Sequence, residues 1–221
     1  MKRLIVVGEG PTEEYFIKEV LAPHLLNASK MKISAEARVH KPGPTNERAR
    51  RGGVGTYKKI KNELIKFCKE DTTATVTTMF DYYGLPKDTP GINTATGTIF
   101  DKAQYIESAV QEDIGNLQNL IFNLTLHEFE GLLFSDISAF EGMTDNRSIE
   151  ELQKIRDGFE TPEHINDDYD TAPSKRIKKI IDTYAKTADG LMIAKSIGID
   201  NISSQCPHFK NWISKLMLLA N

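Results

Sequence analysis

Residues 3–14 read RLIVVGEGPTEE, and this stretch decides how the fold begins. The run from Arg3 to Val7 is apolar after its first residue and rich in β-branched side chains, as in a strand buried on both faces. The glycines in GEG (residues 8–10) predict a turn. Pro11 suits the first position of a helix, and the helix dipole favours the acidic Glu13 in the first turn. The stretch therefore predicts a buried strand, a tight turn and a helix.

Strand and helix patterns alternate through the first two thirds of the chain. Further strands are predicted at residues 32–40, 73–80 and 117–126, and further helices at 57–67 and 100–114. The later patterns are helical, at 174–184, 188–197 and 209–219, with another helix opening at a capping box formed by Ser148 and Glu151. This order predicts an α/β fold with a mostly parallel four-stranded sheet flanked by helices. We expect residues 1–135 to form that domain and a helical C-terminal portion, residues 136–221, to pack on it.

The composition is that of an ordinary globular protein. Of the 221 residues, 39% are hydrophobic and 27% are charged, which excludes wholesale disorder, collagen and coiled coil. No apolar run approaches the roughly 20 residues of a membrane span, and the first apolar stretch is too short for a signal peptide. Cys68 and Cys206 match neither a disulfide framework nor a zinc motif. We therefore expect a cytoplasmic protein that has no membrane partner.

The formal net charge of −3 hides a segregated distribution. Between Arg38 and Lys69, ten basic residues accompany only two acidic ones, a local charge of +8. This segment indicates an anionic partner, although a solvated helix face beside an acidic one gives the same pattern. We expect nucleic acid, DNA in preference to RNA, with its phosphates held by Arg50, Arg51, Lys58, Lys175 and Arg176. The last two lie in the first turn of a predicted helix, where basic groups oppose the dipole and a bound phosphate would explain them.

Carboxylates follow three of the four predicted strands. Glu9 follows the first strand, Asp81 the third, and Glu128 and Glu130 the fourth. Ligands of open α/β sheets bind outside the carboxyl ends of the strands, so these groups are candidate catalytic residues. Glu13 occupies the place of the third glycine of a dinucleotide turn, and acids there repel a directly bound phosphate. Hard oxygen ligands favour Mg²⁺ or Mn²⁺ instead, held by Glu9 and Asp81 first, with Glu13 and one of the other two completing the site.

The stretch VVGEGPTE (residues 6–13), which closes a strand and opens a helix, resembles the first motif of Toprim domains. The likeness is strongest to the Toprim domains of overcoming-lysogenization-defect nucleases. Toprim domains occur in topoisomerases, primases and nucleases, and they hold Mg²⁺ with a glutamate and an Asp-x-Asp pair. The resemblance implies that Glu9 is that glutamate and Asp81 the first aspartate. Tyr83 stands in place of the second aspartate, so a full two-metal site requires Glu128, Glu130 or Asp88 as a substitute.

A longer set of motifs is similar to the bacterial family known as domain of unknown function 4276. The segments are EGPTE (9–13), GGV (52–54), FDYYGLP (80–86), HEFEGLLF (127–134), IND (165–167), TAPSKR (171–176) and CPHF (206–209). They span nearly the whole chain. Members of this family look Toprim-like and are often encoded beside an ATPase in settings suggestive of phage defence. The resemblance therefore implies an ATPase protein partner.

These observations predict a Toprim-like, Mg²⁺- or Mn²⁺-dependent nuclease that hydrolyses phosphodiester bonds. The alternative is a non-catalytic effector or sensor subunit, in which Tyr83 marks a degenerate metal site. A nucleotide-binding oxidoreductase is disfavoured by Glu13. A topoisomerase is disfavoured because strand transfer needs a tyrosine on a separate DNA-gating region.

Overall fold

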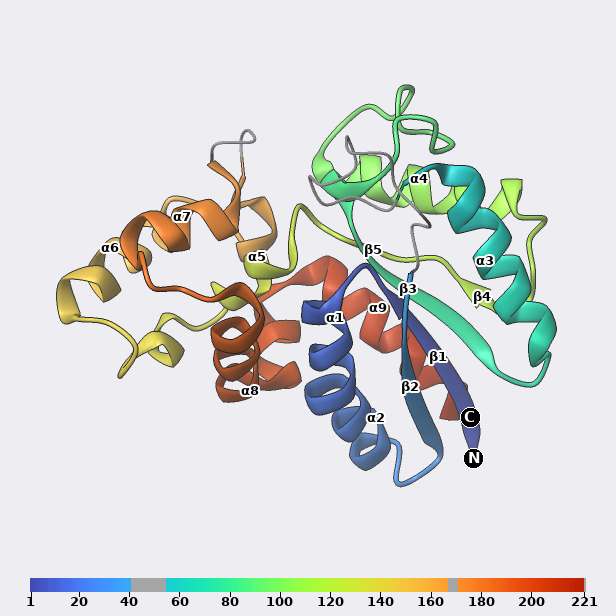
Figure 1. The fold of residues 1–221 in the computed structure, drawn as a ribbon, viewed down its shortest axis with the longest axis horizontal. Helices are drawn as coiled ribbons and strands as arrows, with labels where there is room; N and C mark the ends of the chain where they lie inside the picture. Colours follow the sequence, from blue (N-terminus) through green and yellow to red (C-terminus); the bar gives the residue numbers. More distant parts are fainter. Residues whose placement is uncertain (41–54, 167–170, 221) are drawn as a thin grey trace.

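The computed structural model describes residues 1–40, 55–166 and 171–220 (Figure 1). The strands are β1 (Lys2–Gly8), β2 (Ile33–Val39), β3 (Thr75–Asp81), β4 (Leu120–Ile121) and β5 (Leu124–Thr125). The α-helices are α1 (Pro11–Phe16), α2 (Ala22–Ala28), α3 (Tyr57–Glu70), α4 (Ile99–Asp113), α5 (Phe129–Leu133), α6 (Asn146–Asp157), α7 (Pro173–Ile180), α8 (Lys186–Gln205) and α9 (Pro207–Met217). All strand pairs are parallel, in the order β2-β1-β3-β4, with β5 also on β3. The predicted parallel sheet flanked by helices, with a helical C-terminal region, is confirmed.

The central strand β1 packs on both of its faces. Leu4 and Val6 point into one hydrophobic core, which also contains buried side chains of α1, α2, α8 and α9. Ile5 and Val7 point into a second core, formed with α3 and α4. Figure 1 shows these two helix layers on opposite sides of the sheet. Alternation along an apolar strand therefore accounts for the three-layer arrangement.

The predicted fourth strand, residues 117–126, is interrupted in the structure. β4 and β5 are each two residues long and are separated by Phe122 and Asn123. At the gap, the Thr78 hydroxyl accepts a hydrogen bond from Asn123 N (2.8 Å) and donates one to Asn123 O (2.7 Å). A threonine side chain of β3 thus takes over the backbone bonds that a continuous strand would have made. The hydrophobic pattern did not reveal this substitution.

The first predicted helix contains a widened turn. A π-helical segment, Ile17–Leu21, joins α1 to α2, and Ala22 N bonds to Ile17 O five residues earlier. Pro23 follows directly, and its ring would clash with the carbonyl four residues before it in a regular α-helix. The π-helical turn relieves that conflict while keeping the helix continuous.

Other helix ends also differ from their predictions. Asp145, not Ser148, caps α6, since its carboxylate accepts a hydrogen bond from Ser148 N at 2.8 Å. The predicted capping box at Ser148 is therefore wrong. α8 begins two residues before the predicted helix 188–197, and its helical conformation is interrupted at Gly198, directly after the predicted end. The φ of 75° at this position is readily adopted by glycine alone, and a second helical segment continues to Gln205.

The C-terminal helices share a core with the sheet. Trp212 of α9 is 1% exposed, and its indole Nε1 donates to Thr77 Oγ1 of β3 at 2.9 Å. His208 of the same helix lies 2.9 Å from the Glu107 carboxylate of α4, which also accepts a hydrogen bond from Leu124 N. These contacts join α9 to the sheet and to a helix on its other face. The division between residues 135 and 136 stays a prediction.

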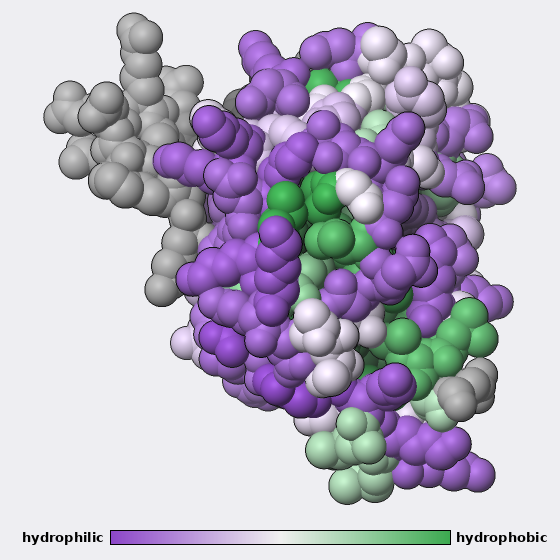
Figure 2. Space-filling view, turned by 90° about the vertical axis from the view of Figure 1, so that its right-hand side faces the viewer, coloured by the Kyte–Doolittle hydropathy of each residue, from purple (hydrophilic) through white to green (hydrophobic). Residues whose placement is uncertain are grey.

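Hydrophilic side chains cover most of the side of the molecule that carries α3 and α4, around a hydrophobic area near its centre (Figure 2). Within the described ranges, no helix combines the length and the apolar character needed to cross a bilayer.

We expect Trp212→Phe to lower the free energy of unfolding by about 2 kcal/mol, because it leaves a small cavity and breaks the bond to Thr77. Urea unfolding followed by circular dichroism should give one transition for the whole chain. Tyr105→Phe, at a half-exposed position, is the control and should change stability by less than about 0.5 kcal/mol. Separate transitions, or an unchanged midpoint for Trp212→Phe, would contradict the shared core.

Candidate functional site: a carboxylate cluster at the sheet edge

Glu9 and Asp81 meet at the carboxyl edge of the sheet. β1 and β3 are parallel neighbours, with Gly8 paired to Met79, so the residues that follow them emerge side by side. The backbone N–H of Asp81 donates to Glu9 Oε1 at 2.9 Å. The Asp81 carboxylate in turn accepts a hydrogen bond from Phe129 N at 3.1 Å. The sequence expectation that these two strand tips converge is therefore met, while their role as metal ligands stays a prediction.

Two glycines make this close packing feasible. A Cβ at Gly8 would lie 2.6 Å from the Glu13 Cβ, too close for any side chain to be accepted without movement. A Cβ at Gly84 would lie 2.6 Å from Glu9 Oε1. The turn after β1 therefore needs glycine at position 8, because the Cβ of Glu13 packs directly against it. A side chain at Gly84, in the 3₁₀ turn Tyr82–Gly84 after β3, would displace the Glu9 carboxylate from its present position.

Glu13 lies in the first turn of α1, four residues after Glu9. Its carboxylate accepts a hydrogen bond from Gly10 N at 2.9 Å and so caps the start of the helix. The side chain is buried, and its charge contributes to a raised pKa at Glu9. Glu13 therefore both caps the start of α1 and contributes a carboxylate to the cluster.

Glu128 and Glu130 have different surroundings. Glu130, on α5, is fully buried, and its charge adds, after burial and the charges of Glu9 and Glu13, to the raised pKa of Asp81. Neither Glu130 oxygen accepts a hydrogen bond of good geometry from any residue that the structure describes. Glu128 directly precedes α5 but makes no side-chain capping bond to it, and its carboxylate instead accepts a hydrogen bond from Ser174 N of α7 at 3.2 Å. Of the two, Glu130 is the better candidate to complete the site.

Lys186 enters the cluster from the C-terminal part of the chain. It is the first residue of α8, and its Nζ lies 3.0 Å from Glu130 Oε2. Burial lowers the pKa of Lys186, yet the charges of Glu130 and Asp81 outweigh burial and raise it. Sequence analysis missed this residue. The pattern that could have found it is a basic side chain in the first turn of a helix, the same pattern that singled out Lys175 and Arg176.

Burial and mutual repulsion dominate the electrostatics of the cluster. Burial, followed by the nearby charge of Glu13, raises the pKa of Glu9 to about 7. Burial also raises the pKa of Glu130 to about 7, and it raises that of Asp81 well above its ordinary value, with Glu9 and Glu13 adding to the effect. Four carboxylates thus share one lysine, which leaves the cluster short of positive charge.

These residues match a divalent cation in charge and donor type. Glu9, Asp81 and Glu13 each have one carboxylate oxygen bonded to a backbone amide and a second oxygen that no described residue engages. Carboxylate oxygens are the ligands that Mg²⁺ and Mn²⁺ prefer. Within residues 1–40, 55–166 and 171–220, however, no three His, Cys, Asp or Glu side chains already surround one common point as metal ligands do. The donor atoms of the cluster therefore suit a divalent cation, and the described side chains are not already arranged around one cation position.

The position two residues after Asp81 carries no carboxylate. Tyr83 is half-exposed and stacks on the His127 ring, with 5.2 Å between ring centroids. His127 has a φ of 62°, in the left-handed region, which turns the chain between β5 and α5. Asp88 is engaged elsewhere, since it accepts a hydrogen bond from Tyr57 N at 3.3 Å. Among the three proposed substitutes for the second aspartate, Glu130 is the one whose charge acts on Asp81.

The predicted phosphate-binding residues fall in three places. Arg50 and Arg51 lie outside the described residues. Lys58 is exposed in the first turn of α3, on the α3–α4 side of the sheet. Lys175 and Arg176 lie together in α7, directly after Ser174, which donates to Glu128. The hydrogen bond from Ser174 N thus places the start of α7 beside Glu128. Nucleic-acid binding by Lys58, Lys175 or Arg176 stays a prediction.

The model of a family described as a domain of unknown function, DUF4276, matches residues 8–217. The chain belongs to the DUF4276 family. It is also similar to a solved structure, the C-terminal region of the Burkholderia pseudomallei OLD protein, with 15% sequence identity, all of both chains covered and a TM-score of 0.46. A comparison with curated proteins gives no match. The family predicted from the sequence motifs is confirmed.

We expect the stability of this DUF4276 protein to fall as the pH rises from about 4.5 to 7 in the presence of EDTA. Burial raises the pKa values of Glu9 and Glu130 to about 7 in the folded state, against 4.5 for an unperturbed glutamate, so the folded state binds more protons in this window. Asp81→Asn removes one charge from the cluster while its amide oxygen can still accept from Phe129 N. This variant should be more stable than the parent at pH 8 and should show a shallower decline.

The measurement is thermal unfolding across that pH range, with Asp182→Asn as the control because Asp182 is exposed and outside the cluster. If Asp81→Asn and Asp182→Asn show the same pH dependence, the electrostatic description of the cluster is wrong.

We also expect Lys186→Met to destabilise the protein by about 1–3 kcal/mol at pH 8, because it leaves the buried Glu130 carboxylate without its cation. The loss should shrink at pH 5, where Glu130 is protonated. A double-mutant cycle measures this pairing by urea unfolding of Lys186→Met, Glu130→Met and the double variant. The double variant should recover most of the free energy of unfolding that Lys186→Met loses. Lys195 lies on the same helix as Lys186 and forms a surface pair with Glu19 of the segment Ile17–Leu21, so Lys195→Met should cost much less. Equal losses at pH 5 and pH 8 would rule out this pairing.

Proposed function

We propose that this protein is a cytoplasmic, Toprim-like nuclease that hydrolyses phosphodiester bonds of nucleic acid, DNA in preference to RNA, with Mg²⁺ or Mn²⁺. The observation that carries the proposal is the convergence of Glu9 and Asp81, joined by a 2.9 Å bond, in a buried cluster with too little positive charge. A divalent cation would offset that charge. When bound, such a cation stabilises negative charge on a phosphate and lowers the pKa of the attacking water.

The side chains of the cluster would have different roles in holding the cation and contacting the substrate. Glu9 and Asp81 would hold the cation, with Glu13 and Glu130 completing the site. Glu128 is the weaker candidate because its carboxylate accepts a hydrogen bond from Ser174 N of α7. Lys186 would keep the carboxylates together before a cation arrives, and its ammonium group could then turn to a substrate phosphate, since its side chain is 45% exposed. Phosphodiester cleavage needs these charges to be placed before the substrate binds.

Phosphates on either side of the cleaved bond would be held by basic side chains. Lys175 and Arg176 are supported by the contact between α7 and Glu128, and the basic segment containing Arg50, Arg51 and Lys58 is supported by its charge. Such contacts position a backbone without reading its sequence. The family resemblance further supports an ATPase partner and a role in phage defence.

The second candidate is a non-catalytic effector or sensor subunit that works through an ATPase partner. Two observations favour it: Tyr83 replaces a carboxylate, and no metal shell is preassembled among the described side chains. Isothermal titration with Mn²⁺ separates the candidates, because an effector with a degenerate site should bind no Mn²⁺ and should not nick plasmid DNA.

We expect Glu9→Gln and Asp81→Asn each to reduce Mn²⁺-stimulated cleavage of DNA by more than about 100-fold, the upper range for residues that only support metal ligands. The assay compares plasmid DNA and RNA with and without Mn²⁺. Glu14→Gln is the matched control, because Glu14 lies next to Glu13 in α1 and pairs with Lys18 on the surface. If Glu9→Gln or Asp81→Asn cleaves DNA as fast as the parent protein, the cluster is not the site of cleavage.

A further inference from the structure

The strand β2 forms the long edge of the sheet (Figure 1). Among the strands that the structure describes, it pairs with β1 alone, in an uninterrupted register along all of its seven residues. The short strands β4 and β5, of two residues each, lie at the other edge. Edge strands of soluble proteins are commonly protected by shortness, bulges, proline or repelling charges. β2 is long and regular, contains no proline and carries charges of both signs.

The outer backbone groups of β2 belong to alternate residues. Directly after the strand, His40 N donates to Gly8 O of β1 at 2.8 Å, so the even-numbered residues of β2 turn their backbone groups toward β1. The N–H and C=O groups of Ala35, Ala37 and Val39 therefore point outward. In the part of the chain that the structure describes, no hydrogen bond reaches these outer groups. They are able to pair with a further strand.

The side chains of β2 suit pairing with a second copy of the same strand. Ala35 and Ala37 face the core and are small. The other face carries Glu36 and Arg38, whose side chains are 41% and 52% exposed. Arg38 pairs with Glu36 of its own strand at 3.0 Å, an exposed contact of the kind that contributes little to stability. Exchanging it for the same contact between two chains therefore costs little.

Charge distinguishes among the two-fold axes that would pair β2 with its copy. An axis at Glu36 or at Arg38 would place that residue opposite its own copy, and like charges directly opposite each other are destabilising. An axis at Ala35 would place Arg38 opposite Lys32. Of the axes at residues 35 to 38, the one at Ala37 alone places Glu36 opposite Arg38.

The axis at Ala37 also suits the backbone. Ala37 then meets its own copy and Ala35 meets Val39, so residues with outward groups face each other and exchange both N–H···O bonds. Glu36 and Arg38 fall at the alternate positions without hydrogen bonds, where opposing side chains lie closest. Backbone and charge therefore agree on one register.

We propose that two copies of this chain associate through β2, in an antiparallel pairing centred on Ala37 that joins their sheets into one. Such an interface is isologous, so the assembly closes at a dimer. Because β2 runs antiparallel to its copy, the carboxyl edges of the two sheets point in opposite directions, and each Glu9–Asp81 cluster belongs to one chain. The inference goes beyond the proposed function and does not depend on it.

The test is sedimentation equilibrium of the full chain in EDTA, so that no cation bridges carboxylates of two molecules. We expect a reversible dimer with a Kd below about 1 mM, the weak end of the affinity scale. Arg38→Glu places acidic side chains opposite each other at both charged positions, and Glu36→Arg places basic ones there. Each variant should weaken the dimer at least about tenfold. Circular dichroism shows whether each variant is folded, as expected for exposed side chains.

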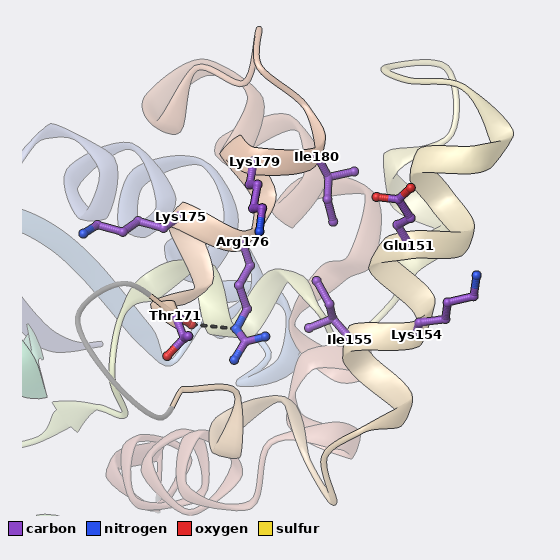
Figure 3. Close-up of a pocket in the computed structure, with 8 residues that line it drawn as sticks. All are labelled: Glu151, Lys154, Ile155, Thr171, Lys175, Arg176, Lys179 and Ile180. Carbon is purple, nitrogen blue, oxygen red and sulfur yellow. Dashed lines mark hydrogen bonds between the residues drawn. The ribbon is translucent and has the colours of Figure 1, made fainter.

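Mixing the two variants tests the register. In a mixed dimer every basic side chain at positions 36 and 38 faces an acidic one, so the mixture should associate about as tightly as the parent. Arg147→Glu is the matched control, because Arg147 is exposed on α6, away from β2 in Figure 1. It pairs with Glu151, which lines the pocket between α6 and α7 (Figure 3). This variant should dimerise like the parent.

The proposal is overturned if the parent is monomeric throughout, if either β2 variant associates as tightly as the parent, or if the mixture does not associate. It is also overturned if Arg147→Glu weakens the dimer as much as Arg38→Glu does. None of these outcomes involves the carboxylate cluster, so they are distinct from the cleavage test of Glu9→Gln and Asp81→Asn.

Discussion

Four carboxylates gathered around one lysine, two of them buried and two partly buried, are the constraint on which the arrangement of this protein depends. Charged groups in a poorly solvated site are costly unless a counter-charge lies close by. Here Glu9 and Asp81 are each held by a backbone amide, and Lys186 lies 3.0 Å from Glu130. One ammonium group cannot neutralise the set, so the folded chain keeps a site that favours protons or another cation. That imbalance is the physical basis for proposing a cation site here, since an ordinary internal salt bridge has matched charges.

The cluster exists only because distant parts of the chain share one core. Glu9 and Asp81 come from neighbouring strands, whereas Lys186 opens α8, which packs on α1 and α5. The bond from Trp212 to Thr77 anchors the last helix to the strand that ends at Asp81. The helical C-terminal region is therefore part of the site, because it supplies the cation that the strand tips lack.

Strand periodicity was enough to predict where Glu9 and Asp81 would meet, because parallel strands place their carboxyl ends at one edge. Lys186 could not be placed in the same way, since nothing local tells which helix start will face the cluster. The break between β4 and β5 was also missed, because it depends on the Thr78 hydroxyl replacing backbone bonds across strands. Local pattern therefore predicted the elements and the strand tips, and tertiary contacts decided the rest.

Tyr83 stands where the Toprim resemblance leads one to expect a second aspartate, and Glu130 brings a carboxylate to the cluster from another element. Tyr83 packs on His127, so no charge is present at that point of the cluster. Glu130 restores a negative charge from a different element, where it is fully buried and acts on Asp81. Glu130 lies on a helix, whereas Tyr83 lies in a half-exposed turn. Burial of the Glu130 carboxylate raises its pKa. The cost of burying this carboxylate falls when a positive charge is near, so the ionised form of Glu130 depends on Lys186, whose Nζ lies 3.0 Å from its Oε2.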